Sequence, residues 1–163
     1  MLIDELKNIA RNNGIVGAGG AGFPAYAKMT EKADTVILNC VECEPLLKLH
    51  RQLLATHTEE IIQMLDEVRE SFGAKEAVIG IKSEYVTTIK AIEEVIGDFP
   101  NVRICALKAA YPMGDEVVLI YEATGRVIKP GGLPIDENVV VYNVETMYNL
   151  YRAVHLNIPV TNK

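Results

Sequence analysis

Four short apolar runs, each rich in β-branched residues, recur along the chain. They are DTVILNCV (34–41), AVIGIK (77–82), VRICAL (102–107) and NVVVYN (138–143). The first two runs are typical of buried strands in a parallel sheet, and the other two are also expected to be strands. Helical spacing of apolar residues occurs at 2–12, 46–72, 87–96, 115–123 and 144–154, with a shorter helical stretch at 25–32. Because strands alternate with helices, the sequence predicts an α/β fold with parallel pairing and right-handed crossovers.

Length and charge exclude several classes of function. The chain has 163 residues, about one domain, and a net charge of −6 at pH 7 without a basic stripe. We therefore expect no nucleic-acid partner. The sequence has no apolar run of about 18 residues, so no membrane span is expected. Three cysteines without a signal peptide favour a cytoplasmic location.

The segment GIVGAGGAGFPAYAKM (14–29) places five glycines within nine positions and then a single cation, Lys28. Such a segment can direct backbone N–H groups at a phosphate, or it can be a flexible connection. Gly17, Gly19 and Gly22 fit G-x-G-x-x-G, but a helical pattern precedes them where a dinucleotide-binding fold has a strand. The sequence therefore favours phosphate binding without predicting that fold.

Polar residues and one glycine lie at or just after the carboxyl ends of three of the four expected strands. They are Asn39, Glu42 and Glu44 at the first, Gly114, Asp115 and Glu116 after the third, and Asn143 and Thr146 at the fourth. Carboxyl ends of parallel strands lie at one edge of a sheet, where α/β proteins bind ligands. Solvated acids, helix N-terminal charges and caps are the ordinary structural alternatives. Cys40 and Cys43 form C-x-x-C, but a metal centre needs about four ligands, so none is predicted.

Several of these motifs, taken together and in order, resemble one family. GIVGAGGAGFPAYAKM, LNCVECEP, YPMGDEVVLIYEATGRVIKPGGLP and NVETMYNLYRAV resemble the flavin-binding domain of the respiratory complex I 51-kDa subunit family. Within it, the chain is most similar to the branch of Rnf complex C subunits, cobalamin reductases and proline-reductase-associated electron-transfer proteins. The resemblance implies a three-layer α/β sandwich that binds FMN across the strand ends and accepts hydride from NADH.

The resemblance also implies roles for individual residues. Gly17, Gly19, Gly20 and Lys28 would hold the FMN phosphate region, and Phe23 would lie near the nicotinamide nucleotide. Asn39, Glu42 and Glu44 would line the flavin and the NADH site, with Glu44 as the candidate catalytic residue. Gly114, Asp115 and Glu116 would form a further wall, and Asn143 and Thr146 would touch FMN.

Departures from the family pattern favour the Rnf-like branch. Complex I members carry an acid at Val41, a glycine at Leu46, often an arginine at Ala18, and an asparagine at Tyr142. Family members also have a ubiquitin-like domain and iron–sulfur domains, and this chain has no C-x-x-C-x-x-C run. We therefore expect residues 1–163 to be a single FMN/NADH-binding domain of a longer electron-transfer protein.

Several alternatives remain open from the sequence. As an FMN-dependent NADH:acceptor oxidoreductase domain, the chain would pass electrons to iron–sulfur centres elsewhere, at a membrane complex or in a microcompartment. A cobalamin-interacting reductase would differ only in its electron acceptor. A non-catalytic nucleotide-binding or docking module of an electron-transfer complex is the alternative from a different class.

Overall fold

A parallel sheet forms the centre of the computed structural model, which describes residues 1–16, 24–41, 49–108 and 116–160. Its strands are β1 (Thr35–Cys40), β2 (Glu76–Lys82), β3 (Val102–Leu107) and β4 (Val139–Asn143). They lie in the order β3-β2-β1-β4, and every pairing is parallel. The predicted parallel α/β sheet is confirmed, with strand ends within about one residue of those expected.

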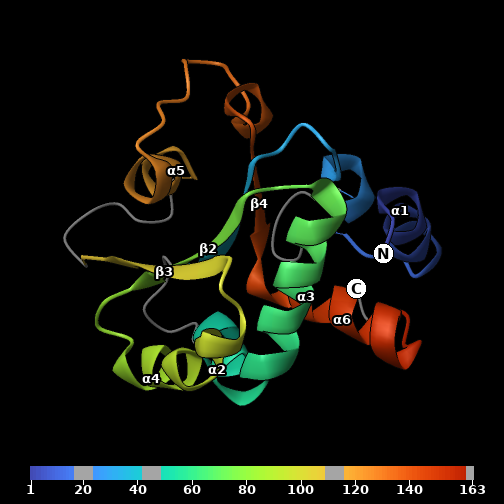
Figure 1. Cartoon of the computed structure of the whole chain (residues 1–163), viewed down its shortest axis with the longest axis horizontal. Helices are drawn as coiled ribbons and strands as arrows, with labels where there is room; N and C mark the ends of the chain where they lie inside the picture. The colour runs from blue at the N-terminus through green and yellow to red at the C-terminus, as the bar shows by residue number, and fades with distance from the viewer. Residues whose placement is uncertain (17–23, 42–48, 109–115, 161–163) are drawn as a thin grey trace.

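Helices cover both faces of the sheet (Figure 1). They are α1 (Ile3–Asn12), α2 (Leu49–Thr56), α3 (Thr58–Phe72), α4 (Val86–Val95), α5 (Glu116–Thr124) and α6 (Val144–Leu156). Short 3₁₀ turns occur at η1 (Ala25–Lys28), η2 (Ile96–Asp98) and η3 (Pro134–Glu137). No helix in the described part of the chain is both long and apolar enough to cross a membrane.

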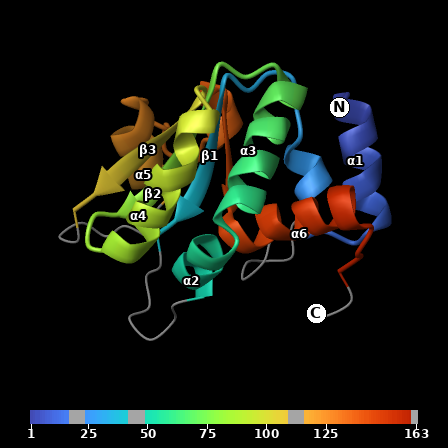
Figure 2. The same ribbon diagram turned by 60° about the horizontal axis from the view of Figure 1, so that its bottom comes forward.

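Alternation along the strands divides the core into two layers. Val36, Leu38 and Cys40 pack with α1, α3 and α6, whereas Ile37 packs with α5 on the opposite face. Figures 1 and 2 show α5 apart from the other helices, with the sheet between them. The predicted three-layer sandwich is thereby confirmed.

Two helical stretches are shorter than the sequence predicted. The expected helix at 46–72 is divided at His57, whose backbone is not helical, with residues 46–48 outside the described part. The Thr58 hydroxyl donates to the carbonyls of Leu54 and Ala55, which takes acceptors that a continuous helix would use. The expected helix at 25–32 is only the single turn η1.

An ion pair fastens the connection between α5 and β4 to the amino end of β1. Arg126 donates to both carboxylate oxygens of Asp34, at 2.6 and 3.1 Å, and to the Glu137 carbonyl at 2.9 Å. Burial by itself raises the pKa of Asp34, but hydrogen bonds from Arg126 and Thr35 outweigh burial and hold the pKa below its ordinary 3.8.

Replacing Arg126 by methionine should lower the free energy of unfolding by about 1.5 kcal/mol at pH 7, because a bidentate, partly buried pair is lost. A lowered folded-state pKa contributes stability above the unfolded pKa and loses it as the pH falls through the folded pKa. The difference between wild type and variant should therefore shrink towards pH 3. Urea unfolding at both pH values tests this, and a difference that is the same at both would contradict it.

Candidate functional site

Asn39 and Asn143 occupy adjacent positions at the carboxyl ends of neighbouring strands. Asn39 on β1 pairs in register with Asn143 on β4. Side chains alternate between the two faces along a strand, so Asn39 lies on the same face as Ile37, and Asn143 on the same face as Val141. Ile37 and Val141 pack in the core layer of α5. Two amide side chains that are far apart in the sequence are therefore brought to one edge.

Each amide oxygen accepts a local backbone hydrogen bond. The Asn39 side-chain oxygen accepts from the N–H of Val41 at 2.9 Å. The Asn143 oxygen accepts from the N–H of Thr146 at 2.8 Å and caps α6. Because both oxygens are bound, the orientation of both amide groups is fixed.

These two asparagines lie where the strand order reverses. From β1 the chain proceeds to β2 and β3 on one side and then returns to β4 on the other side. In open α/β sheets, the crevice at such a switch point is the usual ligand site. The topology therefore favours a ligand between the ends of β1 and β4.

Lys28 lies against β4, the strand that ends at Asn143. Its ammonium group donates to the Val141 carbonyl at 3.1 Å and lies 5.9 Å from the centre of the Tyr142 ring. The turn η1 carries Lys28, and β4 lies at an edge of the sheet. Packing thus places a cation beside the strand that ends at Asn143.

The two ends of the glycine-rich segment are joined to each other and to β4 and α6. Val16 forms an antiparallel bridge with Pro24, and the Ala25 N–H donates to the Ile15 carbonyl at 3.0 Å. The Thr146 hydroxyl donates to the Val16 carbonyl at 3.4 Å. Thr146 is buried, and its hydrogen bond to Val16 anchors the start of the glycine-rich segment to α6.

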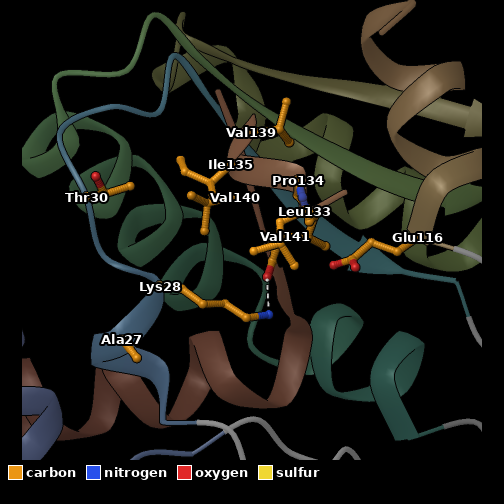
Figure 3. Close-up of a pocket in the computed structure, with 10 residues that line it drawn as sticks. All are labelled: Ala27, Lys28, Thr30, Glu116, Leu133, Pro134, Ile135, Val139, Val140 and Val141. Carbon is orange, nitrogen blue, oxygen red and sulfur yellow. Dashed lines mark hydrogen bonds between the residues drawn. The ribbon is translucent and has the colours of Figure 1, made fainter. Parts of the chain in front are cut away.

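A cavity of about 410 Å³ lies along β4 (Figure 3). Lys28 and Glu116 lie on opposite sides of it, and Figure 3 shows both pointing towards β4. Its wall is largely aliphatic, formed by Ala27, Thr30, Leu133, Pro134, Ile135, Val139, Val140 and Val141. The cavity therefore combines two opposite charges with an apolar wall.

Sequence reasoning did not assign most of this wall to the site. The motif KPGGLP (129–134) predicted only a tight connection, yet Leu133 and Pro134 line the cavity. Leu133 is 62% exposed, which is high for a leucine. An apolar residue in a predicted turn was the signal that could have identified it.

Other predicted site residues lie outside the described part of the chain. They are Gly17, Gly19, Gly20, Phe23, Glu42, Glu44, Gly114 and Asp115. Their roles remain predictions.

The described cysteines and acids form no metal centre. Within the described ranges, no three His, Cys, Asp or Glu side chains are grouped to hold a metal ion. Cys40 is buried, and Cys105, on β3, is half-buried. Burial raises the pKa of the Cys105 thiol, which disfavours its reactive thiolate.

Comparison with known sequences identifies a family and several relatives. The sequence model of the family described as "Nuo51 FMN-binding domain" matches residues 10–152. The chain is 40% identical over 158 residues to the cobalamin reductase PduS of Citrobacter freundii. It is 34% identical over 160 residues to the C subunit of the Na⁺-translocating ferredoxin:NAD⁺ oxidoreductase complex of Acetobacterium woodii. These alignments cover 97% and 96% of this chain but only 35% and 36% of the relatives.

Solved structures include chains of the same fold. One is a chain of an NAD⁺-reducing [NiFe]-hydrogenase in the H₂-reduced state, with a TM-score of 0.78 and 25% identity. The alignment covers 93% of this chain and 30% of the hydrogenase chain. The chain thus spans about a third of the length of each of these three proteins.

Proposed function

The chain belongs to the Nuo51 FMN-binding domain family, and we propose that it binds FMN between the ends of β1 and β4 and accepts hydride from NADH. The observation that carries this proposal is the pairing of Asn39 with Asn143 at the switch point, beside Lys28. Bound FMN would supply a two-electron acceptor that can release electrons singly. The protein would bind and orient the reactants and exclude water.

The chemistry of the described donors fits FMN. Lys28 offers a charge that suits a phosphate, and Asn39 and Asn143 are amides that suit hydroxyl groups and ring edges. The bridge between Val16 and Pro24 places both ends of the glycine-rich segment beside α6 and β4. We propose that Gly17, Gly19 and Gly20 complete the phosphate site with backbone N–H groups.

The cavity along β4 supports a place for NADH. Its volume of about 410 Å³ is in the range of small-molecule pockets, and its aliphatic wall suits a nucleoside. We propose that Glu116 and Asp115 form one wall of this NADH site. Gly114, which has no side chain, would allow NADH to approach the backbone closely. Phe23, Glu42 and Glu44 would lie beside the nicotinamide, with Glu44 orienting it for hydride transfer.

The relatives support a place in electron transfer. Their names describe a cobalamin reductase, a ferredoxin:NAD⁺ oxidoreductase complex and an NAD⁺-reducing hydrogenase. We propose that this chain acts as the NADH-oxidising domain of a longer cytoplasmic protein or complex. Its electrons would go to iron–sulfur centres outside this chain.

An absorption spectrum tests the proposal. The purified chain would be incubated with FMN, desalted, and then mixed with NADH without oxygen. We expect flavin bands that survive desalting and then bleach. If the flavin bands are retained but do not bleach, FMN binding is supported and hydride transfer from NADH is contradicted. Loss of all flavin would contradict the proposed function and favour a docking module.

A further inference from the structure

Tyr142 is a buried residue of β4 that packs beside the turn η1. It is 3% exposed, and strand alternation separates its side chain from that of Asn143. Its hydroxyl donates to the Ala25 carbonyl at 3.2 Å. Burial raises the pKa of the Tyr142 phenol, so the group remains a neutral donor at physiological pH.

This hydrogen bond holds the turn that carries Lys28. Ala25 is the first residue of η1 and Lys28 is the last. The Lys28 ammonium group lies over the Tyr142 ring and binds the carbonyl of the preceding residue, Val141. Tyr142 therefore contacts η1 at its start and, through its ring, at its end.

Thr146 acts on the other end of the glycine-rich segment. Its hydroxyl binds Val16, whereas that of Tyr142 binds Ala25. Val16 and the residue before Ala25, Pro24, are bridged to each other. Hydroxyl groups from β4 and α6 thus fix two adjoining pieces of backbone, of which only the piece held by Tyr142 leads into η1.

We propose that Tyr142 is a positioning residue that fixes Lys28 for the phosphate group of FMN. The proposal rests on the proposed function, because it takes FMN as the ligand. The Tyr142 side chain lies on the opposite face of β4 from that of Asn143, and its hydroxyl acts on Lys28 through η1. Loss of the Tyr142 hydroxyl should therefore weaken binding of the FMN phosphate and leave binding of the flavin ring unchanged.

The test compares FMN with riboflavin, which lacks the phosphate. Tyr142→Phe removes one hydroxyl and keeps the ring. Titration followed by flavin fluorescence should show FMN binding weakened roughly three- to tenfold, the range expected for one hydrogen bond. Riboflavin binding should not change. In a Lys28→Met background, the same substitution should have little further effect on FMN binding.

Tyr151→Phe is the matched control. It removes a hydroxyl from a half-buried tyrosine of α6 whose ring lies 4.7 Å from that of His155. We expect it to change neither affinity. Equal losses of FMN and riboflavin binding in Tyr142→Phe would indicate a general structural defect and overturn the proposal, as would unchanged FMN binding.

Amide hydrogen exchange separates this proposal from the proposed function. If the wild type binds no FMN, the proposed function fails, but the link from Tyr142 to η1 is still measurable. Exchange of the Ala25 and Lys28 amides should be faster in Tyr142→Phe than in Tyr151→Phe, while β1 is unchanged. Equal exchange in the two variants would overturn the link.

Discussion

Replacing Lys28 by methionine is expected to weaken FMN binding about thirtyfold, because a hydrogen bond from a charged group contributes about 2 kcal/mol. Riboflavin binding should be unchanged, since the phosphate is what the ammonium group would contact. The hydrogen bond from Lys28 to Val141 holds that group at the edge of β4 before any ligand binds. Fluorescence titration with both flavins measures the effect.

Lys32→Met is the control for charge. Lys32 is exposed and lies shortly after Lys28 in the chain, and its substitution makes the same change in net charge. This variant should alter FMN binding only slightly, and less at high salt. Similar losses in the two variants would indicate general electrostatic attraction and contradict a specific role for Lys28.

Replacing Gly80 by valine is expected to lower the free energy of unfolding by about 3 kcal/mol, because the core has no room for a side chain there. Gly80 lies in β2, between Asn39 and Cys105 in register. A Cβ atom added to it would meet Leu119 Cδ1 of α5 at 2.4 Å. Leu119 is fully buried, so its movement displaces its neighbours. Urea unfolding measures the loss.

Gly97→Val and a double variant complete this test. A Cβ atom at Gly97 meets no described atom within 4 Å, so its substitution should cost much less. In Leu119→Ala, which opens space against β2, adding Gly80→Val should cost less than in the wild type. If Gly80→Val were as stable as Gly97→Val, the close packing of α5 would be contradicted. Since Glu116 begins α5, displacement of the helix would also change the cavity wall.

The strands were predictable because the local pattern of apolar, β-branched residues indicates each strand without reference to distant parts of the chain. The run TVILNC has an apolar centre without alternation, which indicates a strand buried on both faces. The break at His57 was not predictable in this way. It depends on the Thr58 hydroxyl binding carbonyls of the preceding turn, a competition that hydrophobic spacing does not record.

The candidate site was predictable only in part. Asn39 and Asn143 could be assigned to strand ends, and parallel pairing brings such ends to one edge. That the two asparagines are direct neighbours follows from the order β3-β2-β1-β4. The role of Leu133 in the cavity wall and the contact of Tyr142 with Ala25 depend on packing between distant segments.

The sequence by itself determined the four strands, most of the helices, the parallel α/β class and the polar residues at the strand ends. These properties are local, because side-chain period and backbone preference act within a few residues. Only the tertiary structure decided that β4 lies beside β1 and that Lys28 binds Val141, 113 residues away. Such contacts arise because buried faces and hydrogen-bonding groups must be satisfied across the whole fold, and many segments of similar pattern could satisfy them.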